Sequence, residues 1–138
     1  MHSAVRLLST REHSRYELER KLLRHYADEV VHQVLDELKR QGLQSDDRFT
    51  ESYVHSRRNK GYGPLRIRAE LSGKGVAEEL IAAWLDESPD DWDKLMRRVA
   101  NKKYGSDPPV DRKEMAKRGR FLASRGFPSW LINDYLFG

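Results

Sequence analysis

The sequence predicts an all-α fold, built as a tandem array of three three-helix repeats. Apolar residues recur at helical spacing along most of the 138 residues, and no stretch shows the sustained alternation of a half-buried strand. An apolar pattern also returns at a nearly constant offset of about 50 residues, which is a signature of internal repeats. These observations place the repeats at residues 1–45, 46–88 and 89–138.

The first repeat is expected to open with two helices. Val5 and Leu8 suggest a short first helix. The second helix is predicted to start at Ser14, because Glu17 stands three residues later, at the spacing of a capping box.

The third helix of this repeat is predicted from about residue 28 to residue 41. Gly42 can adopt the left-handed conformation that ends many helices, and Leu43 follows where a Schellman cap takes an apolar contact. The predicted apolar face of the helix consists of Val30, Val31, Val34, Leu35 and Leu38.

The same apolar pattern marks the last helix of the other two repeats. The equivalent positions are Leu80, Ile81, Trp84 and Leu85 in the second repeat, and Leu131, Ile132, Tyr135 and Leu136 in the third. The three tryptophans lie on apolar helix faces and are expected to pack in the core rather than stack on bases. They are Trp84, Trp92 and Trp130.

Turn and cap residues mark the remaining helix boundaries. Gly63 and Pro64 are predicted as the cap and first residue of the middle repeat's second helix, with Ile67 facing the core. A loop is predicted at residues 105–109, because glycine and proline both break helices. Other helix starts are predicted at Ser45 or Asp46, at Ser88 ahead of Pro89, and at Asp111.

Positive charge is concentrated in two blocks, although the formal net charge is only +4. Six cations face one acid between residues 55 and 75, and eleven face three between residues 94 and 125. Residues 76–93 contain seven acids and no base. This distribution is typical of a protein that binds an acidic partner, either nucleic acid or an acidic protein surface. The alternative is that the charges only keep the protein in solution.

The sequence argues against enzymatic chemistry and bound cofactors. The absence of cysteine excludes disulfides, cysteine-based zinc sites and thiol catalysis, and it fits a reducing, cytoplasmic location. Residues 58–71 contain two glycines and a proline, but their spacing matches neither a P-loop nor a dinucleotide-binding loop. The five histidines show no metal-ligand spacing. The longest apolar run, residues 80–85, is far shorter than the roughly 20 residues of a membrane span. We therefore expect no catalytic residue, metal, cofactor or membrane segment.

Twelve basic residues are the candidate contacts with a partner. Cations near the end of the middle repeat's first helix suit the negative end of a helix dipole. That explanation does not extend to the cations beyond the following turn or in the third repeat. The candidates are Arg57, Arg58, Lys60, Arg66, Arg68, Arg97, Arg98, Lys102, Lys103, Lys117, Arg118 and Arg120.

Three segments resemble the RecX family, regulators of the RecA recombinase. They are STREHSRYELERKL at residues 9–22, LKRQGLQSDDRFTESYVHSRRNKGYGPLRIRAELSGKGV at 38–76 and RFLASRGFPSWLINDYL at 120–136. The resemblance runs over nearly the whole chain. It suggests the basic, aromatic segment 53–68 and the turn 125–127 as structural or contact positions, while the linker Asp107-Pro108-Pro109 departs from it.

The resemblance implies an elongated, curved array of three-helix units that binds RecA–DNA filaments within their groove. Such a protein is not an enzyme. It usually inhibits strand exchange, ATPase and coprotease activities in DNA repair, homologous recombination and the SOS response. We expect a monomer. Weak, nonspecific contact with single- or double-stranded DNA is compatible with this reading, because the filament contains DNA. Two alternatives stay open: a helix-turn-helix-like module that binds DNA directly, and an all-helical scaffold with incidental charge.

Overall fold

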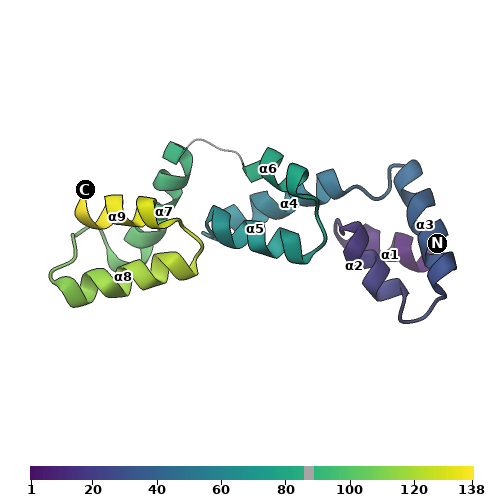
Figure 1. Ribbon diagram of the computed structural model, residues 1–138, viewed down its shortest axis with the longest axis horizontal. Coiled ribbons are helices and arrows are strands. Elements are labelled where there is room, and N and C mark those ends of the chain that lie inside the picture. The colour runs from purple at the N-terminus through teal and green to yellow at the C-terminus, as the bar shows by residue number, and fades with distance from the viewer. Residues whose placement is uncertain (86–88) are drawn as a thin grey trace. The chain divides into compact units, whose positions relative to one another are not determined.

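The computed structural model describes residues 1–85 and 89–138 (Figure 1). In this part of the chain every regular element is an α-helix and there is no strand, so the all-α prediction is confirmed. The helices are α1 (His2–Thr10), α2 (Arg15–Leu22), α3 (Asp28–Arg40), α4 (Asp46–Asn59), α5 (Pro64–Gly73), α6 (Glu78–Leu85), α7 (Pro89–Tyr104), α8 (Arg112–Ser124) and α9 (Ser129–Phe137).

The described helices group into two compact bodies. The N-terminal body contains Met1–Tyr53 and Leu71–Trp84. The C-terminal body contains Val54–Glu70 and the described part of Leu85–Gly138. Helices α4 and α5 therefore contribute residues to both bodies.

A small apolar core holds together the first three helices of the N-terminal body. Its buried members are Ala4, Leu18, Leu22, Val31, Leu35 and Leu38. The α3 members are four and then three residues apart, as one face of an amphipathic helix requires. Val30 was expected on this face but is 47% exposed. Neighbouring helix residues point about 100° apart, so Val30 turns outward once Val31 faces the core.

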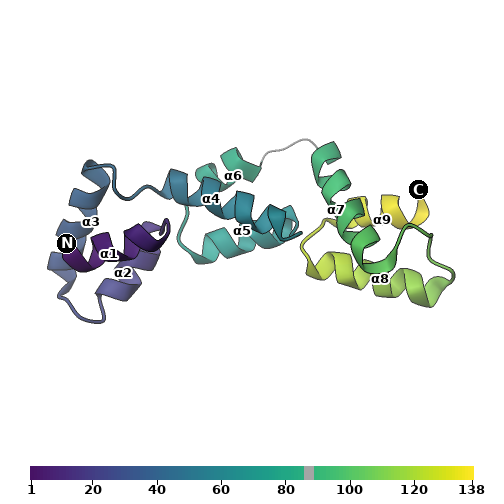
Figure 2. The same cartoon turned by 180° about the vertical axis from the view of Figure 1, so that it is seen from behind.

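The C-terminal body has its own core beneath α7, α8 and α9. Helices α8 and α9 lie side by side in both views (Figure 1 and Figure 2). The buried apolar side chains of this body are Val54, Ile67, Leu85, Trp92, Leu95, Met96, Ala100, Leu122, Phe127, Leu131 and Ile132. The predicted core position of Ile67 is confirmed.

The three tryptophans have different surroundings. Trp92 is buried, as predicted. Trp84 is half-buried and its Nε1 donates to Asp47 Oδ1 at 2.8 Å. Trp130 is 57% exposed, so the prediction that it packs in the core was wrong. Its neighbour Leu131 takes the core-facing position of α9 instead.

The predicted caps of the first repeat are present as hydrogen bonds. Ser14 and Glu17 form a complete capping box at the start of α2. After α3, Gly42 has a φ of +73°, and the Leu43 N–H donates to Leu38 O at 2.9 Å. This is the backbone bond that defines a Schellman motif.

The later helix boundaries also follow their turn residues. Ser45 Oγ accepts a hydrogen bond of 3.2 Å from the backbone N–H three residues on, and Asp111 caps α8 with a bond of 2.9 Å in the same way. Helix α5 begins at Pro64, and residues 105–109 lie between α7 and α8. The cap predicted at Ser88 lies outside the described residues.

In the N-terminal body, the turn ahead of α6 packs against the start of α2. Ser14 Oγ donates to Lys74 O at 2.8 Å. A Cβ added at Gly75 would lie 2.6 Å from the Tyr16 Cβ, which is too close for any residue but glycine. We call this contact the N-terminal joint.

In the C-terminal body, the equivalent turn ahead of α9 packs against the start of α5. The Gly63 N–H donates to Arg125 O at 2.7 Å. A Cβ added at Gly126 would lie 2.6 Å from the Arg66 backbone nitrogen. This turn follows that of the N-terminal joint by 51 residues, the offset of the repeat. The C-terminal joint therefore repeats the N-terminal joint one unit later.

Candidate interaction surface

All twelve predicted contact residues belong to the C-terminal body. Residues 57–68 lie in its first segment and residues 97–120 in its second. The two groups of predicted contacts, which an acidic stretch separates in the sequence, therefore occur in one compact unit. The distances among their side chains show which charges are neutralised within the fold.

Five cations surround a groove of about 420 Å³ on this body. They are Lys60, Arg98, Lys102, Lys103 and Arg125. The floor includes Leu95, Val99 and Phe121, and no carboxylate belongs to the described residues that line it. We call this feature the cationic groove.

Three elements position the cations of this groove. Arg98 and Lys102 are four residues apart on α7, so they share one face of that helix. Lys60 follows α4 and Arg125 follows α8, and Arg125 Nη1 donates to Lys60 O at 3.1 Å. Gly61 lets this turn approach α7, since a Cβ there would lie 3.0 Å from Val99 Cγ2.

The Tyr62 ring contacts three guanidinium groups beside the groove, and one of them belongs to Arg125 of the groove itself. Arg57, Arg66 and Arg125 lie 3.9, 4.3 and 4.8 Å from the centroid of the Tyr62 ring. Arg57 also pairs with both oxygens of Glu70, at 2.9 and 2.8 Å. These contacts tie the end of α4 to α5 and to the turn ahead of α9, so these arginines have a structural role.

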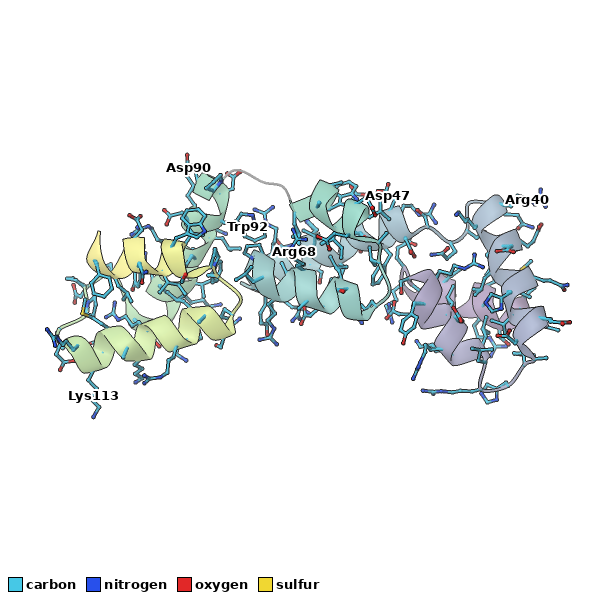
Figure 3. All side chains as sticks on the ribbon, in the orientation of Figure 1. Arg40, Asp47, Arg68, Asp90, Trp92 and Lys113 are labelled. Carbon is cyan, nitrogen blue, oxygen red and sulfur yellow. The ribbon has the colours of Figure 1, made fainter. Side chains whose placement is uncertain are left out.

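Arg66 belongs to the C-terminal joint as well as to the predicted contact surface. Its Nη1 donates to Ser124 O at 3.2 Å, and its backbone lies against Gly126. In the sequence, Arg66 and Arg68 flank Ile67, which was predicted to face the core. Arg66 is exposed, whereas Arg68, labelled in Figure 3, is half-buried on α5.

Arg118 lies in the interior, with only 3% of its surface exposed. Its guanidinium donates to Glu114 Oε1 at 3.1 Å, to Tyr135 Oη at 2.9 Å and to Asp107 O at 3.0 Å. The hydrogen bond from Arg118 lowers the pKa of the Glu114 carboxyl. We therefore remove Arg118 from the candidate contacts, because its donors are used within the fold.

Other predicted contacts are partly or wholly engaged by neighbours. Arg97 pairs with Asp93 at 3.0 Å and with Asp134 at 3.2 Å. The Arg58 guanidinium lies 5.0 Å from the centroid of the Trp92 ring. The ion pairs of Arg97 and the ring contact of Arg58 reduce the capacity of these side chains to bind a partner.

The remaining two predicted contacts are exposed on α8. Lys117 lines neither the cationic groove nor the groove between α8 and α9, whereas Arg120 lines the latter. The twelve predictions do not include Arg125 or Phe121, which complete the cationic groove, although the resemblance had suggested the turn 125–127 as structural or contact positions. These two residues approach Lys60 through the C-terminal joint, and the spacing of residues along the sequence does not predict that approach.

Other kinds of site were searched for in the described residues. In residues 1–85 and 89–138, no three His, Asp or Glu side chains converge on a possible metal position. No helix in the same ranges is long and apolar enough to cross a membrane.

The sequence matches the RecX family along its length. Residues 1–38 match the first three-helix domain of RecX, residues 45–85 the second and residues 90–136 the third. These ranges follow the predicted order of the three units.

Whole proteins of the same kind are also similar. Regulatory protein RecX of Pseudomonas putida strain KT2440 is 43% identical over 137 residues, covering 99% of this chain and 88% of the relative. Regulatory protein RecX of Ectopseudomonas mendocina strain ymp is 43% identical and covers 99% and 91%. The crystal structure of RecX from Lactobacillus salivarius has the same fold, with a TM-score of 0.82, 23% identity and coverage of 98% and 90%. With three matched domains and this identity over nearly its full length, the chain belongs to the RecX family of regulatory proteins.

Proposed function

We propose that this protein regulates RecA by binding the RecA–DNA filament, and that the cationic groove is a main contact. The names of the relatives support a regulator, and the groove supports an acidic partner. The usual effect of such binding is inhibition of strand exchange, ATPase and coprotease activities. The protein then acts as a non-enzymatic, monomeric, cytoplasmic component of DNA repair and the SOS response.

The observation that carries this proposal is the uncompensated charge of the cationic groove. Arg98 and Lys102 are exposed, and neither forms an ion pair within the described part of the chain. Arg57, Arg97 and Arg118, by contrast, have carboxylate partners. Cations gathered in a concave surface create a positive potential that attracts phosphates or acidic side chains.

The direct test is RecA's DNA-dependent ATPase, measured while this protein is added at substoichiometric and then saturating amounts. We expect the rate to fall. Inhibition at low ratios indicates capping of filament ends or triggered disassembly, and a need for near-equal amounts indicates coating of the filament groove. An unchanged rate at saturation would refute the proposal.

The groove is tested with the double variant Arg98→Glu and Lys102→Glu. We expect filament affinity to fall by about tenfold or more, because two attractive charges become repulsive. The matched control is Lys94→Glu with Lys113→Glu, which changes net charge equally at exposed positions of α7 and α8 outside the groove. Equal losses in both double variants would mean that net charge matters rather than the groove.

A second candidate function is direct binding of DNA. Phe121 lines the groove, with Lys103 Nζ 4.2 Å and the Arg125 guanidinium 5.3 Å from the centroid of its ring. Cations beside an aromatic floor are the composition of nonspecific single-strand sites. Titration with bare single- and double-stranded DNA, with and without RecA, separates the two functions. Tight binding to bare DNA that RecA does not improve favours this second candidate.

A further inference from the structure

A second groove, of about 630 Å³, runs between α8 and α9 on the C-terminal body. It differs in chemistry from the cationic groove because its lining is mainly apolar. The apolar lining residues include Met115, Ala116, Gly119 and Ala123 of α8, and Ile132 and Leu136 of α9. We call it the α8–α9 groove.

Small side chains keep this groove open along α8. Ala116, Gly119 and Ala123 are three and four residues apart, so they share one face of the helix. A Cβ added at Gly119 would make ordinary contacts with Leu136 Cδ1 at 3.5 Å and Ile132 Cγ2 at 3.8 Å. Phe137 at the end of α9 also lines the groove and is 71% exposed. An apolar hollow of this kind suits the apolar face of another element.

Charge at the rim narrows the choice of occupant. Arg112 and Arg120 both line the groove, and they are eight residues apart on α8, which corresponds to about 12 Å. Neither guanidinium forms an ion pair within residues 1–85 or 89–138. The described lining contains no carboxylate. The complementary occupant therefore carries carboxylates about two helical turns apart beside an apolar stripe.

We propose that the α8–α9 groove docks an acidic amphipathic helix of the RecA protein in the filament. This inference rests on the proposed function and adds that the two grooves bind different parts of the filament. The cationic groove meets phosphates or acidic surface, while the α8–α9 groove holds protein. A DNA backbone fits this groove poorly, because it would bring charged phosphates against an apolar floor.

Two single substitutions test the groove. Arg120→Glu reverses one rim charge, and Ala116→Glu places a carboxylate among the apolar lining residues. Both positions are exposed on α8, and glutamate is a good helix former, so folding should be preserved. Circular dichroism and thermal unfolding check this.

Each variant has a matched control. Lys113→Glu makes the same charge change on the same helix, and Figure 3 shows Lys113 extending from α8 on the side away from α9. Ala82→Glu makes the same alanine change at an exposed position of α6.

Binding is measured to DNA-free RecA, to RecA assembled on single-stranded DNA, and to single-stranded DNA alone. We expect Arg120→Glu and Ala116→Glu to weaken both RecA complexes about tenfold relative to their controls. Binding to DNA alone should fall no more for Arg120→Glu than for Lys113→Glu.

Three outcomes would overturn the inference. If the groove variants bind RecA as well as their controls do, the groove is not the contact, although the proposed function stands. If Arg120→Glu selectively loses affinity for bare DNA, the occupant is nucleic acid. If sedimentation shows that the parent protein self-associates and Arg120→Glu does not, the occupant is a second copy of this chain. Failure of the parent itself to bind RecA would instead remove the proposed function.

Discussion

The N-terminal and C-terminal joints are equivalent contacts between a turn and the start of a helix, but the charges around them are neutralised to different extents. In the N-terminal joint, Lys74 Nζ lies 3.3 Å from Glu17 Oε2, and Arg11 Nη2 lies 3.1 Å from the same oxygen. Nearby, Arg48 pairs with Glu12 at 3.1 Å. Carboxylates therefore neutralise the cations that gather around the start of α2.

In the C-terminal joint, Arg125 occupies the position equivalent to Lys74 and forms no ion pair within the described residues. Its guanidinium lies over the rings of Tyr62 and Phe121 instead. The joint thus directs Arg125 into the cationic groove, where no described carboxylate lies. The comparison shows that carboxylates can neutralise the cations of one joint while the equivalent cation of the other joint forms no ion pair within the described residues.

The largest effect is expected when the joints themselves are broken. Gly126 has a φ of +99°, and a Cβ would meet the Arg66 backbone nitrogen, which no side-chain rotation can relieve. Gly126→Ala should cost about 3–4 kcal/mol of unfolding free energy, by backbone strain and steric overlap together. Gly75→Ala should have a similar effect through Tyr16. Urea unfolding followed by circular dichroism measures both.

Gly105→Ala is the control for these substitutions. Its φ is +80°, but a Cβ there would have no neighbour within 4 Å. Gly105→Ala should lower the unfolding free energy by only about 1–2 kcal/mol, the cost of placing alanine in the left-handed backbone conformation. If Gly126→Ala is no more destabilising than Gly105→Ala, the close packing of the C-terminal joint is not needed for stability.

The second-largest effect is expected at low pH, where the N-terminal joint should lose stability. Burial raises the pKa of Glu17, but hydrogen bonds from Arg11 and Ser14 outweigh it, and the pKa falls to about 2 from the usual 4.5. Because the folded-state pKa is the lower one, this stabilisation is complete above pH 4.5 and is lost as the pH falls toward 2. The loss should be on the order of 2–3 kcal/mol.

His13 should contribute a second loss of stability in the N-terminal body, and this loss should begin at a higher pH. Burial lowers the pKa of His13 below its usual 6.5, so folding favours the neutral ring. This contribution is complete above pH 6.5 and declines as the pH falls below it. Amide hydrogen exchange at Leu18 and Leu35 measures both losses of stability. It is followed at pH values above 6.5, between 4.5 and 6.5, and below 4.5, so that the contributions of His13 and Glu17 are separated. Glu17→Gln should remove the acidic part alone. An unchanged pH profile in that variant would assign the acid sensitivity to other groups.

The smallest effects on stability should come from substituting the two equivalent cations, Lys74 and Arg125. These substitutions compare the function of the two joints most directly. Lys74→Gln and Arg125→Gln should each cost about 1 kcal/mol or less, through one ion pair and one set of aromatic contacts respectively. Their effects on filament binding should differ: Arg125→Gln should weaken it about tenfold, or 1.4 kcal/mol, and Lys74→Gln should not change it. Equal binding by the two variants would mean that the joints do not differ in function.

Local sequence was enough to predict the helices, because helix hydrogen bonds and caps join residues that are close in the chain. The capping box at Ser14 and the helix start at Pro64 were both foreseen in this way. Resemblance to RecX was also visible in the sequence. Burial was less predictable: Val30 and Trp130 have apolar side chains on helices, yet both are exposed. Val31 and Leu131 take the core-facing positions beside them, and a residue on a helix points about 100° away from its neighbour.

Tertiary structure decided which cations remain for a partner. In the sequence, Arg98, Arg118 and Arg125 are equivalent members of one basic block. In the fold, Arg118 is buried against Glu114 and Tyr135, whereas Arg98 and Arg125 line the cationic groove. The free energy of a charge depends on its distance to other charges and to water, and these distances exist only once helices far apart in the chain have packed.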